Sequence, residues 1–184
     1  MNALTRTGVL AAVTAVGAVG ALAATTVASA HDGDGDPYTV TARLSGYQED
    51  PATISTTGAG SVRLRVDPGA QTIRYTVRWA NLEGTVTQSH IHFGGRHQSG
   101  GISAFLCSNL GNGPAGTQAC PTTNPAEISG TLRAADVVGP VPQGITAGEI
   151  DELLQAIAAD TTYVNVHTTL YPSGEIRSQL THDH

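Results

Sequence analysis

The chain has no lysine, so its nine basic side chains are all arginines, and acidic residues outnumber them to give a formal net charge of −6. No basic segment with interleaved aromatic residues occurs, which argues against nucleic acid as a partner. The same acidic balance disfavours binding to anionic membrane surfaces. Hydrolase signatures are also missing, because there is no Gly-x-Ser-x-Gly elbow, no recognisable pair of catalytic carboxylates and no glycine-rich phosphate loop before a helix. No unit of 20–50 residues repeats, which excludes a solenoid.

Long apolar runs are absent after residue 30. Before it, an Ala/Val-rich stretch over residues 9–28 follows Arg6 and ends in a small-x-small pattern at residues 28–30, which signal peptidase cuts. An uncleaved membrane anchor is the alternative, since the run is nearly long enough to span a bilayer. Its Gly and Thr content and the cleavage pattern favour a signal peptide over residues 1–30. We therefore expect a secreted or extracytoplasmic protein with no membrane contact after cleavage.

Cysteine is scarce, and the two that occur, Cys107 and Cys120, bracket a Gly/Asn/Pro-rich loop over residues 108–119. A disulfide between them would close a short loop and contribute about 3 kcal/mol of stability. A redox-active or metal-binding pair would need closer spacing, such as Cys-x-x-Cys. In an oxidising compartment the pair predicts a structural disulfide.

After removal of the signal peptide, residues 31–37 are Gly/Asp-rich and expected to be disordered, and residues 182–184 form a short tail. Residues 38–181 suit one domain. Alternating apolar and polar positions predict strands over residues 38–44, 62–66, 73–79, 86–93, 102–107, 128–132, 163–168 and 175–180.

A single helix interrupts this pattern late in the chain. Thr146 and Glu149 have the spacing of a capping box, and apolar residues then recur at helical intervals at Ile150, Leu153, Leu154 and Ile157. Many short strands with one late helix predict a mainly β protein, an antiparallel β-sandwich or barrel.

Three histidines on strands form the strongest chemical lead. His90 and His92 stand on one face of their strand, about 7 Å apart at their roots, while Ile91 and Phe93 point to the other face. His167 lies on a later strand, and if the two strands are close, three neutral imidazoles converge on a site suited to copper or zinc. The alternative is that these histidines are polar residues on a solvated strand face.

Other histidines offer weaker candidates. His97, in a Gly-rich segment, is a possible fourth ligand, and an N-terminal His31 could chelate copper through its amine and ring. His182 and His184 are expected to be solvated.

Three polar residues are expected to support the site. Asn165 shares a face with His167 and could orient a ligand imidazole. Glu175 and Arg177 share a face of the last strand and are expected to form a structural ion pair, with Glu49 as an alternative partner for Arg177.

Three motifs, taken in order, resemble those of the CHRD (chordin-type) family. Residues 44–51 (LSGYQEDP) resemble its opening L-x-G-x-Q-E-x-P, residues 89–94 (SHIHFG) its H-I-H-x-G, and residues 163–179 its closing Y-V-N-V-H-T…P-x-G-E-I-R-G-Q. Ser178 replaces the usual Gly, and residues 108–125 lie outside the common pattern. The resemblance implies a secreted bacterial single-domain member with an extracellular β-domain and no assigned activity. It also supports the metal interpretation, because the motifs are built around the three histidines.

Three functions remain open at this point. The first is an exported binding module that holds one copper or zinc ion, for metal handling or as a scaffold at the cell surface. The second is a copper-dependent redox enzyme similar to superoxide dismutase, and the third is an adhesion domain that binds an extracellular protein without metal. A site with three ligands and an open position favours the enzyme, whereas a closed four-ligand site favours binding. If the protein binds a metal in either of the first two functions, its affinity for the ion should fall below about pH 6.5, because bound imidazoles must be neutral.

Overall fold

The computed structural model describes residues 35–181, which form a mainly β unit as the alternation predicts. The eight strands are β1 (Tyr38–Ser45), β2 (Ala59–Asp67), β3 (Thr72–Ala80), β4 (Val86–Phe93), β5 (Gly101–Ser108), β6 (Ala126–Leu132), β7 (Thr162–Thr168) and β8 (Ile176–Leu180). The helices are α1 (Ile150–Ala158) and three short 3-10 turns, η1 (Gly46–Gln48), η2 (Ala134–Asp136) and η3 (Val141–Gln143). Every strand expected from the sequence is present, and most are one or two residues longer.

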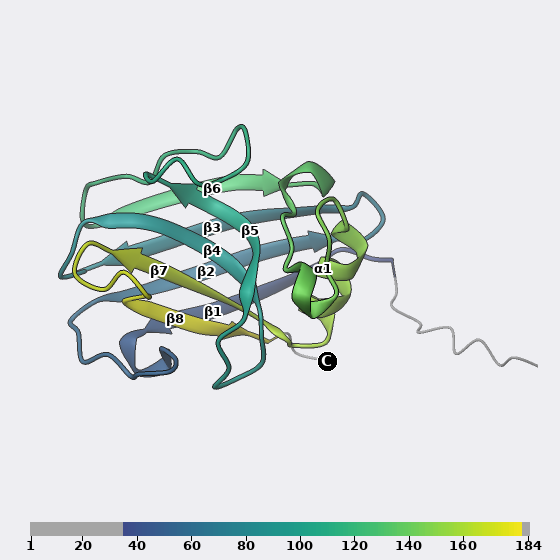
Figure 1. Ribbon diagram of the computed structural model, residues 1–184. Coiled ribbons are helices and arrows are strands. Elements are labelled where there is room, and N and C mark those ends of the chain that lie inside the picture. Colours follow the sequence, from purple (N-terminus) through teal and green to yellow (C-terminus); the bar gives the residue numbers. More distant parts are fainter. Residues whose placement is uncertain (1–34, 182–184) are drawn as a thin grey trace, which may run out of the picture. The chain divides into compact units, whose positions relative to one another are not determined.

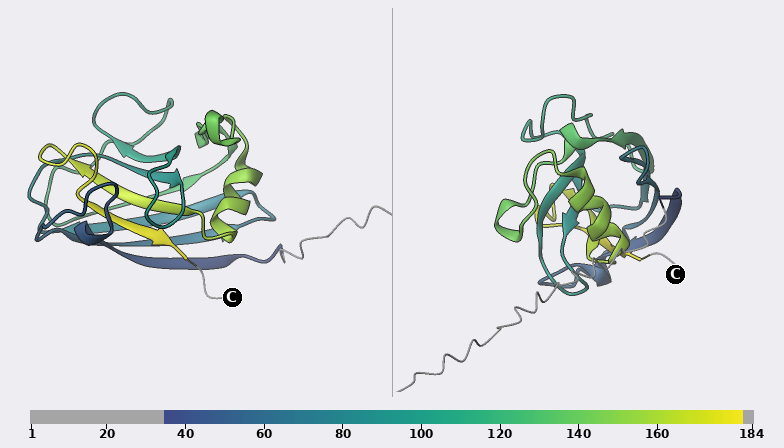
Figure 2. Two further views of the ribbon diagram at one scale, coloured as in Figure 1. Left: turned by 60° about the horizontal axis from the view of Figure 1, so that its bottom comes forward. Right: turned by 90° about the vertical axis from the view of Figure 1, so that its right-hand side faces the viewer.

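All eight strands belong to one antiparallel sheet in the order β5-β4-β7-β8-β1-β2-β3-β6. The sheet curls on itself until its edge strands β5 and β6 approach each other, which makes a nearly closed barrel (Figures 1 and 2). Residues far apart in the chain thereby become neighbours, because β4 pairs with β7 across some 75 residues of sequence, with Ile91 opposite Val164. This pairing brings the histidine strands together.

The inward faces of the strands form the core. On β3, Ile73, Tyr75, Val77 and Trp79 are buried, while Arg74 and Arg78 between them are exposed. The same alternation on the other strands fills the barrel with Val, Leu and Ile side chains. One face of each strand is therefore defined by burial in the core, and the other lies on the outside of the barrel.

The gap between β5 and β6 is bridged by side chains and by the segment that follows β5. The Gln118 amide donates to Leu106 O on β5 and to Ser129 O on β6, and the Tyr75 hydroxyl also donates to Leu106 O at 2.8 Å. The predicted Cys107–Cys120 disulfide is present and fixes this loop to β5. The disulfide therefore positions the residue that bridges the two edge strands.

The helix α1 lies at one end of the barrel (Figures 1 and 2). Its predicted apolar stripe is buried, with Leu153 and Ile157 fully inaccessible to solvent. The helix begins at Ile150, one residue after the proposed box. Only half of that box forms, since the Glu149 carboxylate accepts the backbone N–H of Thr146 at 2.7 Å but no side chain caps the helix in return.

Several sequence predictions lie outside the described residues, namely the signal peptide over residues 1–30, the first part of the 31–37 segment, and the tail at 182–184. Within residues 35–181, no helix has the length and apolar character that crossing a bilayer requires.

Candidate metal centre

The three histidines lie on the outer side of the barrel wall. His90 and His92 alternate with Ile91, which is part of the core, so their rings point away from it, as predicted from the His-x-His spacing. On the neighbouring strand β7, Asn165 is opposite His90 and His167 is opposite Gln88. The register therefore places all three imidazoles on one face of adjacent strands.

This outer face is not solvated, which rules out the alternative that its histidines are polar residues on a wet strand. His90, His92 and His167 are 0 %, 7 % and 6 % exposed. Residues 94–100, which connect β4 to β5, lie over one side, where the carbonyl of Gly100 contacts His92. The turn after β7 covers the other side, where the carbonyl of Pro172 contacts His167. We call the outer side of β4, β7 and β8 the covered face.

The three rings form one group, here called the histidine triad. Their ligand nitrogens all lie within 4.8 Å of one another. The ring centroids of His90 and His92 are 5.3 Å apart, and those of His90 and His167 are 5.0 Å apart. Phe105 of β5 closes the group from the side, with its ring edge-on to His90 at 4.5 Å.

Two backbone carbonyls determine where the protons of the triad reside. His92 Nδ1 lies 2.9 Å from Gly100 O, and His167 Nδ1 lies 2.9 Å from Pro172 O. A carbonyl oxygen only accepts, so each Nδ1 must carry the hydrogen, and each neutral ring then has its lone pair on Nε2. Histidines that bind metals are oriented in this way, by donating the other ring N–H to a carbonyl or carboxylate.

The lone pairs that result have few protein partners. The Nε2 atoms of His90 and His92 are buried, and neither has a hydrogen-bond partner among the described residues. His167 Nε2 lies 3.2 Å from His90 Nδ1. An unpartnered buried polar atom costs about 1–3 kcal/mol, so the His92 lone pair indicates a ligand beside it, while His90 turns Nδ1, and not its unpartnered Nε2, toward His167.

Asn165 lies beside the same atoms, as its predicted supporting role requires. Its side-chain oxygen is 2.9 Å from Nε2 of His167. A carbonyl oxygen and a lone pair repel each other, so this contact is satisfied either by a rotated amide that donates its N–H, or by a cation that both atoms bind. Asn165 can therefore orient His167 in the metal-free site or approach the metal in the loaded one.

The environment keeps all three imidazoles neutral. Burial, reinforced by the neighbouring His167 and His92, lowers the pKa of His90 to about 2. Burial also lowers the pKa of His92 to about 4, against the opposing effect of the Gly100 carbonyl. The pKa of His167 is lowered by burial too, although the Pro172 carbonyl raises it. Neutral imidazole is the form that binds a metal.

The donor set fits a borderline transition metal. A tetrahedral ion with metal–nitrogen distances of about 2.0–2.1 Å holds its ligand nitrogens about 3.3 Å apart. The 3.2 Å between His90 Nδ1 and His167 Nε2 already meets that spacing, and Nε2 of His92 needs to approach by a short movement of its ring. Three imidazoles with neither thiolate nor carboxylate suit zinc or copper better than magnesium or calcium.

Tyr163 and Arg177 form a stack against the ring of His92. The Tyr163 ring stacks on the His92 ring, with centroids 4.6 Å apart and planes 3° from parallel. The guanidinium carbon of Arg177 lies 3.5 Å from the centroid of the Tyr163 ring. Glu49 lies nearby, and its burial, only partly offset by Arg177, raises the pKa of its carboxyl to about 8. This stack fixes the plane of one ligand ring.

The structure gives Glu175 and Arg177 partners other than each other, which corrects the expected ion pair. The Glu175 carboxylate accepts hydrogen bonds from the Thr56 and Thr168 hydroxyls at 2.7 and 2.8 Å and from the Glu83 backbone N–H at 2.8 Å. Arg177 instead donates to the carbonyls of Gly95 and Gln98. Glu175 bonds to Thr168, which alternates with His167 on β7 and so points away from the covered face, whereas Arg177 is paired with Asn165, so the two side chains do not share a face.

Of the remaining histidine candidates, His97 alone lies among the described residues, and it does not join the triad. His97 is exposed, on the segment that crosses the covered face, and it is not part of the group that could hold a metal. His31, His182 and His184 lie outside the described residues. Among residues 35–181 the candidate site therefore has three histidine ligands.

Sequence reasoning missed two residues that shape the centre, Phe105 and Tyr163. Tyr163 alternates with Val164 and faces the same side as Asn165 and His167, so strand periodicity could have identified it. Phe105 is brought to His90 by the pairing of β4 with β5, which includes two register irregularities that no local pattern indicates.

Comparison with known proteins gives one match. The model of the CHRD domain family matches residues 40–180, which includes all three histidines of the triad and both strands that hold them. No curated protein and no solved structure matches the chain significantly. Because the family model covers most of the chain, and its motifs coincide with the strands and turns that build the covered face, the chain belongs to the CHRD family.

Proposed function

We propose that this protein is an exported binding module that holds one copper or zinc ion through His90, His92 and His167. The observation that carries the proposal is the pair of backbone carbonyls, on Gly100 and Pro172, which commit the Nδ1 hydrogens of two buried histidines and leave their Nε2 lone pairs facing a third. A histidine that served packing alone would have both ring nitrogens paired or solvated.

The burial of the histidine triad favours retention of a metal ion rather than catalysis on a substrate. The triad is at most 7 % exposed, and residues 94–100 and Pro172 lie directly against its rings, so a metal there would be retained and shielded. A role in metal handling, or a scaffold whose covered face the metal fixes in place, follows from such a site. Export is supported by the Cys107–Cys120 disulfide, which an oxidising compartment maintains.

A copper-dependent redox enzyme is the second candidate, and the ligand count favours it. Three protein ligands leave a fourth position on a tetrahedral ion, and His97 does not close it. Turnover of superoxide by the copper-loaded protein, lost when the triad is replaced, would support this alternative. An adhesion domain without metal is the outcome if neither metal binds.

The test is a titration of the mature chain from Asp32 onward with zinc and with copper. His182→Ala and His184→Ala are included in every protein, so that terminal histidines do not contribute. The parent should bind one equivalent tightly, and His90→Ala/His92→Ala/His167→Ala should lose it. His97→Ala is the matched control, because it removes an exposed histidine near the site, and it should bind like the parent. Equal binding by the parent and the triple variant would overturn the proposal.

A further inference from the structure

The outer side of β1, β2, β3 and β6 carries many arginines, although the chain as a whole is acidic, with a net charge of −6. The strand registers place its outward residues in three rows that cross the four strands. The rows are Arg43-Ser61-Arg78-Glu127, Thr41-Arg63-Thr76-Ser129 and Thr39-Arg65-Arg74-Thr131. We call these twelve residues the arginine face.

The composition of the arginine face is specific. It holds five of the nine arginines of a chain with net charge −6, one carboxylate, and six Ser or Thr hydroxyls. All five arginines are exposed. The sequence contains no basic run, because each arginine alternates with a core residue, and only the antiparallel pairing of three strands brings the five together.

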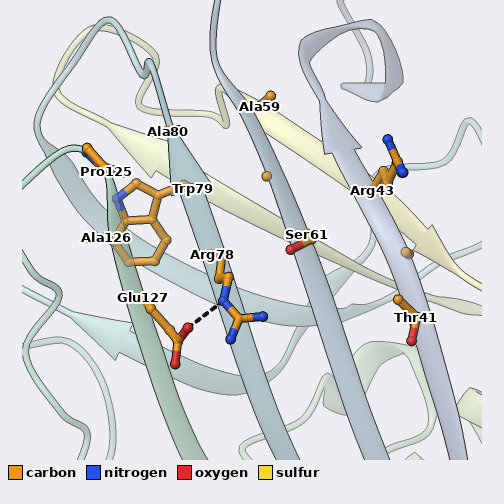
Figure 3. A pocket seen from close by; sticks show the side chains of 12 residues that line it. Thr41, Arg43, Ala59, Ser61, Arg78, Trp79, Ala80, Pro125, Ala126 and Glu127 are labelled. Atoms are coloured by element: carbon orange, nitrogen blue, oxygen red, sulfur yellow. Dashed lines mark hydrogen bonds and ion pairs between the residues drawn. The ribbon is translucent and has the colours of Figure 1, made fainter.

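The arrangement is unfavourable for the isolated protein. Arg65 on β2 lies directly opposite Arg74 on β3, and like charges in that position destabilise a sheet. Only Arg78 has an acidic partner, Glu127, in the one side-chain ion pair among the described residues (Figure 3). Four guanidiniums with no ion-pair partner on one face of an acidic protein are complementary to an anionic ligand.

The face is also hollowed at both ends. A shallow groove of about 780 Å³ runs across the first row, between Arg43 and Arg78, and Figure 3 shows these two side chains on either side of Ser61. Small residues such as Gly60 and Ala80 line it, so a ligand can approach the backbone. A second hollow of about 170 Å³ lies at the other end, lined by Arg65 and Arg74 together with Thr72 and the carboxylate of Asp67. A ligand that used both hollows would be long and would carry its charges at intervals.

We propose that the arginine face binds a linear acidic polysaccharide that bears carboxylates. Guanidinium groups bind carboxylates in a two-pronged fashion, and the six hydroxyls between them can pair with sugar hydroxyls. None of the twelve positions is aromatic, and Trp79, which lines the groove, is only 2 % exposed, so bases of a single-stranded nucleic acid would have almost no exposed ring to stack on. None is a large apolar residue that could insert into a membrane. A peptide could not add a strand here, because the backbone groups of these strands already pair with each other.

The test is retention of the full mature protein on immobilised polygalacturonate, with dextran as the neutral polymer. A chelator is present throughout, so that metal held by the triad or by the polymer plays no part. The wild type should bind polygalacturonate and not dextran, with affinity falling as salt rises. Arg65→Gln/Arg74→Gln should weaken binding at least about tenfold. Arg96→Gln, which removes an exposed arginine from the segment over the covered face, should stay within about twofold.

A variant that is expected to strengthen binding separates a specific effect from loss of binding through misfolding. Glu127→Gln removes the one carboxylate of the arginine face and frees Arg78, so it should strengthen binding about two- to threefold. The proposal is overturned if the wild type binds dextran equally, if Arg96→Gln weakens binding as much as Arg65→Gln/Arg74→Gln, or if polyglutamate, an oligonucleotide or phosphatidylglycerol vesicles compete better than soluble polygalacturonate.

Discussion

The two outer sides of the barrel wall use charged residues in opposite ways. On the covered face, charged and polar groups are buried beneath loops, and each carboxylate, guanidinium and imidazole has a specific place, as with Arg177, which is 2 % exposed. On the arginine face, the five guanidiniums are exposed to solvent, and the face has a single carboxylate, Glu127, which pairs with Arg78. The same sheet thus carries a pre-organised interior-like site on one side and an open electrostatic surface on the other. Covering a strand face with loops turns polar side chains from solvated groups into determinants of stability and chemistry.

Replacing the buried Glu175 and the exposed Glu127 should give the largest contrast in stability. Glu175→Ala removes the acceptor of three hydrogen bonds at a residue that is 0 % exposed, and we expect it to destabilise the fold by about 3–5 kcal/mol. Glu127→Ala removes an exposed ion pair on the arginine face and should change stability by less than about 1 kcal/mol. Urea unfolding of both variants measures this difference. Similar losses in the two proteins would show that a buried carboxylate with three donors contributes no more to stability than an exposed one.

Acid should act on the covered face of the metal-free protein. In the metal-free protein the unfolded chain protonates its histidines near pH 6.5, whereas the pKa of His92 in the fold is about 4. The unfolded state therefore binds more protons in this window, so the contribution of His92 to stability is complete above pH 6.5 and is lost as pH falls toward 4, by about 3 kcal/mol for His92 alone.

Glu49 adds a contribution of the opposite sign. Its pKa is raised from 4.5 to about 8, so the folded state holds the extra proton, and stability declines as pH rises from 4.5 to 8. Glu49→Gln should remove that decline, and His92→Gln should flatten the acid side. Chemical unfolding of the wild type and both variants between pH 4 and 8 tests these contributions, and pH profiles that are identical in the three proteins would contradict the burial of these groups.

The smallest expected effect is a gain. Arg65→Thr removes the like-charge contact with Arg74 and introduces a β-branched residue, so stability should rise by about 0.3–1 kcal/mol at low salt and by less at high salt. A loss of stability that does not depend on salt would mean that Arg65 contributes packing.

The sequence predicts the strands and the triad well because both depend on local alternation. His90 and His92 must share a face on any strand, and Ile91 identifies that face as the outer one. Burial of the face could not be predicted, because it depends on residues 94–100 folding back over β4 and β8, a contact between Gln98 and Arg177 that leaves no local pattern. Alternation alone places four of the five arginines of the arginine face on the outer side of β2 and β3, whereas Arg43 joins them only through the pairing of β1 with β2.

The partners of single charged groups were the least predictable. Glu175 and Arg177 are two residues apart, which suggests a shared face, but β8 begins only at Ile176. The carboxylate instead reaches Thr56, 119 positions away in the chain. Such contacts depend on how β8 and the loop after β1 meet, and therefore on the closure of the whole sheet.

X-ray absorption at the metal edge of the zinc-loaded mature protein without terminal histidines decides whether the histidine triad holds the ion. We expect three imidazole nitrogens at about 2.0–2.1 Å, and two in His167→Gln, with the Cys107–Cys120 sulfurs absent from the shell. A shell of water and carboxylate oxygens, or one that His167→Gln leaves unchanged, would show that the metal binds elsewhere and that the histidine triad is not its site.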